Sequence, residues 1–117
     1  MANTAKSVRI LPDPLRSAAF GVITNGYVAI GTPLAHPARI VKFKNFTDAV
    51  IFISWDGVDD HVALAANSGD VEDETANKSS VEGMYIAEGT QFYIKYASGA
   101  PTMGSVYIEV RYGYIGS

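Results

Sequence analysis

Alternation of apolar and polar side chains dominates this chain and predicts β-strands. The clearest run is SVYIEVRYGYI at residues 105–115. It places Val106, Ile108, Val110, Tyr112 and Tyr114 on one side and Ser105, Tyr107, Glu109 and Arg111 on the other. Strict alternation of this length predicts a strand with one buried and one solvated face. No window of ten or more residues keeps helical periodicity, so the pattern predicts an all-β domain.

The stretch from Ala38 to Leu64 predicts three strands in succession, at 39–44, 49–55 and 61–64. NFTD separates the first two, and the Asp56-Gly57 turn follows the second. Asn, Asp and Gly tolerate the backbone of tight hairpin turns, so an antiparallel meander is predicted. The middle run, AVIFISW, is apolar on both faces, which is typical of a strand covered on both sides. We expect either that a second sheet and a neighbouring subunit cover the two faces, or that the chain's own long arm covers one of them.

Further segments bring the prediction to about eight strands. Asn25-Gly26 lies between two β-rich runs in GVITNGYVAI and predicts a hairpin with a type I′ turn. Strands are also predicted at 84–87 and 91–96, and the polar stretch 65–83 as a surface loop or a weakly paired edge strand. Short strands at this spacing favour an antiparallel β-sandwich, with a jelly roll as its finer form.

The first twenty residues predict an extended N-terminal arm, followed by a single β-sandwich domain at 21–117. Pro12 and Pro14 disfavour a helix or a central strand there. An apolar arm must pack against something, and both its own domain and a neighbouring subunit stay open as that surface. In the second case the predicted partner-binding residues of the arm are Leu11, Leu15 and Phe20.

Composition narrows the classes of function. A chain of 117 residues suits one domain, and the absence of cysteine excludes disulfides, thiol nucleophiles and cysteine zinc sites. Nine Lys and Arg against twelve Asp and Glu give a net charge of −3 without a basic stripe. Phosphate backbones are bound by several cations acting together, so no nucleic-acid partner is expected. No leader or membrane-length apolar stretch is seen, and a soluble chain without a membrane partner is expected.

The best candidate for chemistry is the acidic turn with Asp56, Asp59, Asp60 and His61. Carboxylates beside an imidazole suit acid–base work or a divalent cation. The spacing matches no EF-hand loop, so a solvated hairpin turn is favoured over calcium binding and over catalysis. Nucleophile elbows, phosphate-binding glycine loops and zinc-protease motifs are absent from the sequence. We therefore expect no catalytic residue, no metal, no cofactor and no small-molecule substrate.

Seven tyrosines, most of them in the C-terminal third, suggest contact surfaces. Tyrosine combines an apolar ring with a polar hydroxyl, which suits protein interfaces and sugar-stacking platforms alike. By strand parity Tyr107 falls on a solvated face, and Tyr93 shares a face with Lys95. These two tyrosines are predicted partner-binding residues, although most of the rings are expected simply to cover the sandwich.

Four segments together resemble small virion structural proteins of tailed bacteriophages, over about Val8 to Tyr112. They are RILPDPLRS, YVAIGTPLAHPARIVKFKNFTD, ISWDGVDDHVALAANS and EGTQFYIKYASGAPTMGSVYIEVRYG. The resemblance implies a β-sandwich made in the host cytoplasm and present in many copies in the virion. It implies a capsid-decorating or cement protein, or a ring component of the neck or tail, and such proteins have no catalytic residues to carry over.

These observations lead to one leading hypothesis and two alternatives. The leading hypothesis is a homo-oligomeric virion protein that decorates and stabilises the head shell, with the major capsid protein as its partner. A neck or tail ring or adaptor component is the first alternative. The second alternative is a small carbohydrate-binding module, in which exposed tyrosines stack on sugar rings.

Overall fold

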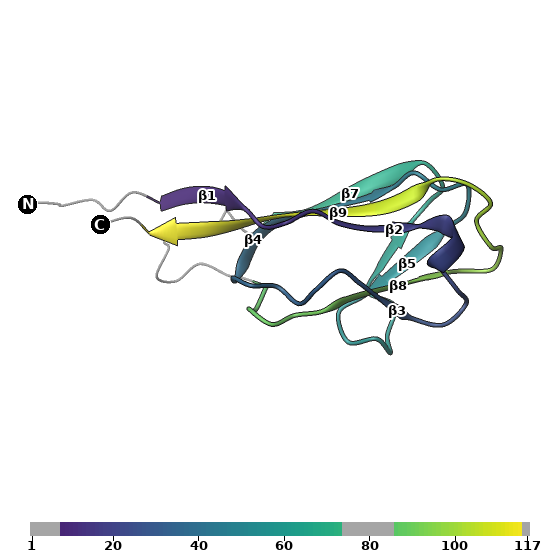
Figure 1. Cartoon of the computed structure of the whole chain (residues 1–117), viewed down its shortest axis with the longest axis horizontal. Coiled ribbons are helices and arrows are strands. Elements are labelled where there is room, and N and C mark those ends of the chain that lie inside the picture. The colour runs from purple at the N-terminus through teal and green to yellow at the C-terminus, as the bar shows by residue number, and fades with distance from the viewer. Residues whose placement is uncertain (1–7, 74–85, 116–117) are drawn as a thin grey trace, which may run out of the picture.

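A computed structural model describes residues 8–73 and 86–115, with side chains described from Leu11 to Val71 and from Ile86 to Gly113. Within these residues nine strands form two facing antiparallel sheets (Figure 1), so the predicted β-sandwich is confirmed. One sheet holds β1 (Val8–Pro12), β2 (Arg16–Ala19), β4 (Ala38–Asn45), β7 (Ser68–Asp73) and β9 (Ser105–Ile115). The other holds β3 (Val28–Ile30), β5 (Ile51–Ser54), β6 (Val62–Leu64) and β8 (Phe92–Tyr96).

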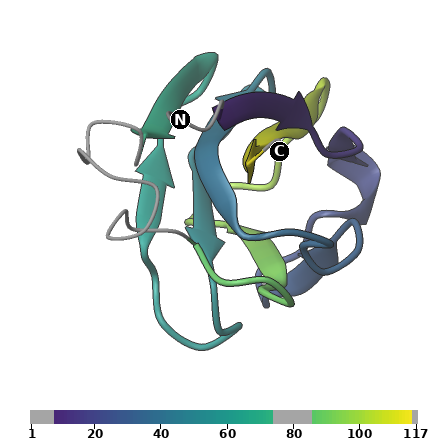
Figure 2. The same ribbon diagram turned by 90° about the vertical axis from the view of Figure 1, so that its left-hand side faces the viewer.

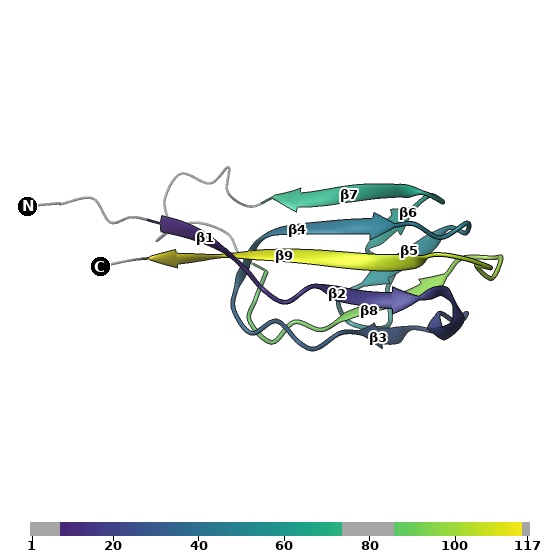
Figure 3. The same cartoon turned by 45° about the horizontal axis from the view of Figure 1, so that its top comes forward.

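The longest strand, β9, organises the five-stranded sheet. One of its edges pairs with β4, and the other pairs first with β2 and then with β1, in the order β1-β9-β4-β7. Beyond the sandwich β1 and β9 continue together as a two-stranded ribbon toward the ends of the chain (Figures 1 and 3). Val106, Ile108 and Val110 are fully buried, which confirms the alternation predicted for this strand.

The core lies between the sheets, which face each other in the end-on view of Figure 2. Its two largest buried side chains, Phe43 of β4 and Phe92 of β8, meet edge to face with ring centroids 5.8 Å apart. The four-stranded sheet, ordered β3-β8-β5-β6, buries Ile51, Ile53 and Ile94 against them. Burial of these branched and aromatic side chains is the main stabilising contribution of the fold.

The predicted meander is wrong at its first turn, because β4 and β5 lie in different sheets. NFTD makes a crossing between the sheets, anchored by the fully buried Asn45. The second half of the meander is correct, since β5 pairs with β6 with Ile51 opposite Leu64. The strand predicted to begin at His61 begins one residue later.

The predicted Asn25-Gly26 hairpin is also wrong. Residues 20–22 form the short 3-10 helix η1 (Phe20–Val22), and β3 pairs with β8, far away in sequence. A type I′ turn needs positive φ at both central residues, and neither Asn25 nor Gly26 has it. The Thr24 hydroxyl instead closes the turn by donating to the Gly26 carbonyl at 2.8 Å.

The N-terminal arm packs along its own domain, where β1 and β2 lie end to end on one edge of β9. Of its two prolines, Pro12 is the last residue of β1 and Pro14 lies in the connection between these edge strands. On β5, Ile51 and Ile53 face the core and Phe52 is half-buried, while Val50, just before the strand, is exposed. The outer face of AVIFISW therefore has no complete cover within the described residues.

The polar stretch contains an edge strand, β7, which pairs only with β4 and so matches the second predicted alternative. Residues 74–83 and the first half of the predicted strand at 84–87 lie outside the described residues. Within that predicted strand, Ile86 forms an isolated antiparallel bridge with Ala38. Exposed acidic side chains on an edge, such as Asp70, oppose unwanted strand addition.

Gly104 is expected to be indispensable in the connection between β8 and β9. Its φ of +87° is in the left-handed region, and a Cβ there would lie 2.1 Å from the Phe46 carbonyl oxygen. Strain of order 1–3 kcal/mol plus this clash predicts that Gly104→Ala lowers the free energy of unfolding by roughly 2–4 kcal/mol. In the same connection Gly99 has no atom within 4 Å of such a Cβ, so Gly99→Ala should change it by less than about 0.5 kcal/mol. Urea denaturation of both variants tests this, and equal losses would contradict it.

Candidate functional site

Exposed apolar side chains gather at the end of the sandwich opposite the chain termini. We define the distal patch as Phe20, Val22, Phe46 and Met103, which are 41 to 61% exposed. They come from η1, the β4–β5 connection and the β8–β9 connection, which meet at that end (Figure 3).

Backbone hydrogen bonds hold the three segments of the distal patch together around Gly104. The Phe20 N–H donates to the Gly104 carbonyl and the Phe46 N–H to the Ser105 carbonyl, both at 3.0 Å. The Phe46 ring also meets the Tyr107 ring edge to face at 5.7 Å. Large apolar side chains that are exposed together on a rigid base are typical of a protein-binding surface.

A second feature is a cavity of about 340 Å³ on the five-stranded sheet. It lies beside β9, at the connection between β1 and β2. Its walls are Pro12, Asp13, Leu15, Glu109 and Arg111. Leu15 is 58% exposed, so the cavity offers an open apolar wall beside charged groups.

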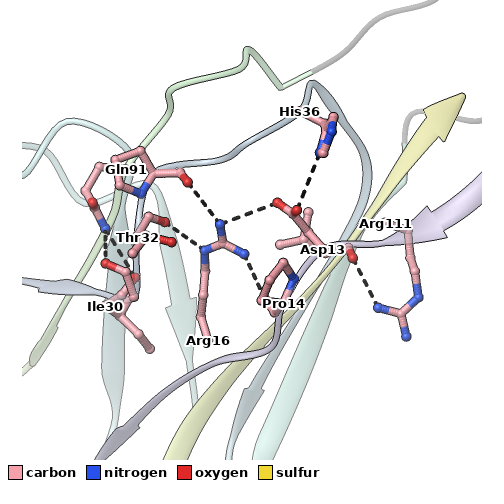
Figure 4. Close-up of polar contacts among 11 residues, drawn as sticks. Asp13, Pro14, Arg16, Ile30, Thr32, His36, Gln91 and Arg111 are labelled. Carbon is pink, nitrogen blue, oxygen red and sulfur yellow. Dashed lines mark hydrogen bonds and ion pairs between the residues drawn. The ribbon is translucent and has the colours of Figure 1, made fainter.

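Asp13 of the cavity wall belongs to a buried ion pair (Figure 4). The Arg16 guanidinium lies 3.5 Å from the Asp13 carboxylate and donates to the carbonyls of Pro14, Thr32 and Pro33. His36 approaches the same carboxylate at 3.6 Å and stacks on the Tyr112 ring. The β1–β2 connection is thereby fixed to the β3–β4 connection.

Charged side chains continue from the cavity across the outer face of the five-stranded sheet. Glu109 lies 2.7 Å from the Lys44 ammonium and 3.6 Å from the Arg111 guanidinium. The hydrogen bond from Lys44 lowers the pKa of Glu109, which stays ionised. Lys42, exposed and opposite Glu109 in the register, adds a third cation. Among the described side chains of this outer face, three cations therefore surround the carboxylate of Glu109.

The outer face of the four-stranded sheet carries a different cluster, around Lys95. Its ammonium lies 3.5 Å from the Asp60 carboxylate, 4.7 Å from the centroid of the Tyr27 ring and 5.8 Å from that of Phe52. The Tyr27 hydroxyl donates to Asp60. Burial and this carboxylate raise the pKa of Tyr27, and the same hydrogen bond lowers the pKa of Asp60.

The acidic turn between β5 and β6 is organised around Asp56. Its carboxylate accepts from the Ser54 hydroxyl and from the backbone N–H groups of Val58 and Asp59 at 2.8 to 2.9 Å. These hydrogen bonds, led by those from the backbone, lower the pKa of Asp56. Ligand atoms of Asp56, Asp59 and His61 lie within 4.8 Å of one another, yet all three side chains are exposed. The hydrogen bonds to Asp56 hold the turn in this shape.

Acid is expected to loosen this turn only at low pH. Because the folded-state pKa of Asp56 lies below the ordinary value, its contribution to stability is complete above about pH 4 and is lost as the pH falls through the lowered pKa. Trp55, the single tryptophan, adjoins the turn. The His61 imidazole lies 5.8 Å from the Trp55 ring, so the measurement is made in a His61→Gln background. There the emission should stay constant from neutral pH to about pH 4 and change below it, and Asp56→Asn should remove much of that change. A transition centred well above this range in that background would contradict the assignment.

The five predicted partner-binding residues do not form one site. Phe20 belongs to the distal patch, Leu15 to the cavity wall, and the half-buried Tyr107 touches Phe46. Tyr93 is half-buried on the other sheet and Leu11 is half-buried in β1. The sequence interpretation did not single out Val22, Phe46, Met103 or Val58. The sequence signal that could have identified these four residues is a large apolar side chain in a turn, where burial is not expected.

Helices long and apolar enough to cross a membrane are absent from the described residues. Comparisons with protein-family models, with curated proteins and with solved structures found no match to this chain.

Proposed function

We propose that this chain is a structural protein of a tailed-bacteriophage virion. It decorates the head shell as a homo-oligomer and attaches through the distal patch. The observation that carries the proposal is the clustering of four exposed, large apolar side chains on one rigid end of the sandwich. Multivalent attachment to a symmetric lattice converts modest contacts of this kind into stable binding.

The strand order supports this proposal. From β2 onward every connection except β5–β6 passes from one sheet to the other, and the sheets read β1-β9-β4-β7 and β3-β8-β5-β6. This strand order supports a jelly-roll arrangement as part of the proposal, and jelly rolls recur among viral capsid proteins and lectins. A fold does not by itself fix a function, so the argument depends on the distal patch.

Two other placements remain as alternatives. A neck or tail component would use the same apolar end against a different virion protein. A sugar-binding platform gains less support, since Lys95 already lies over the Tyr27 and Phe52 rings, and Gly57 lies against the Tyr93 ring.

The direct test is the location of the protein in purified virions of the phage that encodes it. Quantitative mass spectrometry against the major capsid protein and immunogold labelling should show many copies distributed over the head. Label confined to the head–tail junction would favour the neck or tail alternative. Absence from the virion would overturn the proposal.

The distal patch is tested by Phe46→Ser combined with Met103→Ser. Both side chains are more than half exposed, so the variant should fold, while its attachment to heads that lack the protein should weaken about tenfold or more. Val71→Ser is the matched control, because Val71 is 52% exposed on β7 and lies outside the patch. Co-sedimentation with heads measures attachment, and equal binding of the two variants would exclude the patch as the attachment surface.

A further inference from the structure

We propose that copies of this chain associate head to tail, with the Asp56–Asp60 turn of one copy seated in the cavity beside β9 of the next. The inference rests on the homo-oligomeric role proposed above and names the surfaces that would produce it. It follows from a match in shape and charge between two surfaces on opposite sides of one molecule.

The apolar half of the match is Val58. It is 77% exposed at the tip of the turn, the largest value among the exposed large hydrophobic side chains of the described residues. The turn that presents it is held by the Asp56 hydrogen bonds, so Val58 projects from a preorganised base. The cavity offers Pro12 and Leu15 as an apolar wall, and its volume of about 340 Å³ accommodates a side chain of this size.

The charged half of the match is Asp59. Asp56 is engaged within the turn and Asp60 is held by Tyr27 and Lys95, but the Asp59 carboxylate makes no hydrogen bond or ion pair within the described residues. Arg111 stands at the cavity wall with 35% of its side chain exposed.

The other charges on the two surfaces agree with a pairing of Asp59 with Arg111. Two carboxylates line the cavity, and both have cations beside them: Asp13 is paired with the buried Arg16, and Glu109 lies next to Lys44 and Arg111. Lys42 adds a further cation among the described side chains of this face, whereas the turn carries an excess of acid. Complementary potentials of this kind select partner and register.

The two surfaces point in opposite directions. In Figure 1 the β5–β6 turn hangs below the four-stranded sheet, while β1, β2 and β9 form the upper layer; Figure 2 shows the turn on the same lower side. A contact between different surfaces of identical copies is heterologous, so it builds a ring where the rotation closes and a filament where it does not.

The first experiment measures self-association of the purified full chain by sedimentation velocity over a concentration series. The wild type should associate, and more weakly as salt rises from about 0.1 M to about 1 M, because the Debye length falls from about 10 Å to about 3 Å. Val58→Ser, Asp59→Lys and Arg111→Glu should each weaken association about tenfold or more. Asp70→Lys, a charge reversal of an exposed acid on β7, should leave it unchanged.

Exchanging the charges of residues 59 and 111 is the decisive part of the experiment. In a mixture of Asp59→Lys with Arg111→Glu every contact between unlike copies joins opposite charges, as does every contact of the double variant, so both should recover association. Circular dichroism melting curves verify that each variant folds. A wild type that stays monomeric at every concentration would overturn the inference, and so would the absence of recovery in the mixture.

This test is separable from that of the proposed function. A monomeric protein that is nevertheless found on virion heads would remove only the head-to-tail contact. A protein that associates as described but is absent from virions would remove only the virion role.

Discussion

Replacing Asn45 with alanine should lower the free energy of unfolding by about 3–5 kcal/mol, a large part of the roughly 5–15 kcal/mol that a domain of this size has. The side chain is fully buried where β4 leaves the five-stranded sheet. Its amide group donates to the carbonyls of Ala49, Leu64 and Ala65, and its oxygen accepts from the N–H and hydroxyl of Thr47. Alanine would leave several of these groups buried and unpaired, at about 1–3 kcal/mol each.

Two further variants separate this network from simple loss of volume. Asn45→Asp keeps the shape but turns a carboxylate oxygen toward the three carbonyls, so it should destabilise at least as much as alanine. Asn25→Ala, at an exposed turn, should stay within about 0.5 kcal/mol of the wild type. Urea denaturation followed by Trp55 emission measures all three. A loss below about 1 kcal/mol for Asn45→Ala would show that water or a local shift satisfies the exposed groups.

Period-two alternation made β8 and β9 predictable, because over the sandwich both strands bury alternate residues and leave those between them partly solvated, while Tyr96 and Tyr112 at the ends of the buried rows are half-buried. Phe92 and Ile94 of β8 are fully buried while Tyr93 and Lys95 are half-buried, as the parity required. The sequence of a strand shows which of its faces is buried, because successive side chains point to opposite faces.

Which strands pair was not predictable to the same degree. NFTD reads as a hairpin turn, and only the fold reveals that Asn45 binds carbonyls at the end of β6, across the sandwich. Asn25-Gly26 likewise reads as a type I′ turn, but pairing of β3 with β8 decides the backbone there. Contacts between residues distant in sequence overrode the local signal in both cases.

The candidate surfaces were predictable only in part. Leu15 and Phe20 were identified because apolar residues in a proline-rich arm need a partner. The distal patch also needs Phe46 and Met103, which come from connections separated by more than fifty residues. Nothing in a single sequence indicates that these connections meet, so the patch as a surface emerges only from the fold.

Arg16 provides the second large effect. Its side chain is 3% exposed and that of Asp13 only 2%, which is unusual for charges in a proline-rich segment. Arg16→Met should lower the free energy of unfolding by about 3–5 kcal/mol, because it leaves the Asp13 carboxylate buried without its cation. The carbonyls of Pro14, Thr32 and Pro33 also lose the guanidinium as their hydrogen-bond donor.

The double variant Asp13→Asn, Arg16→Met tests the electrostatic part of this loss. Removing both charges should recover about 1–3 kcal/mol relative to the sum of the single losses, since no isolated charge remains buried. A sum that is strictly additive would mean that the carbonyl hydrogen bonds, and not the ion pair, carry the effect.

The pair formed by Lys44 and Glu109 is the matched control, and it shows why distance alone misleads. Its atoms lie 2.7 Å apart against 3.5 Å for Arg16 and Asp13, but its side chains are 40% and 23% exposed. Water screens both ions of the exposed pair in the folded and unfolded states, so Lys44→Met should cost less than about 1 kcal/mol and its effect should fade in high salt. The Arg16 effect should persist in high salt, because counterions do not reach a buried pair. If the two effects were equal in size and in salt dependence, burial would not be what distinguishes these pairs, and Asp13 and Arg16 would be solvated in the folded protein.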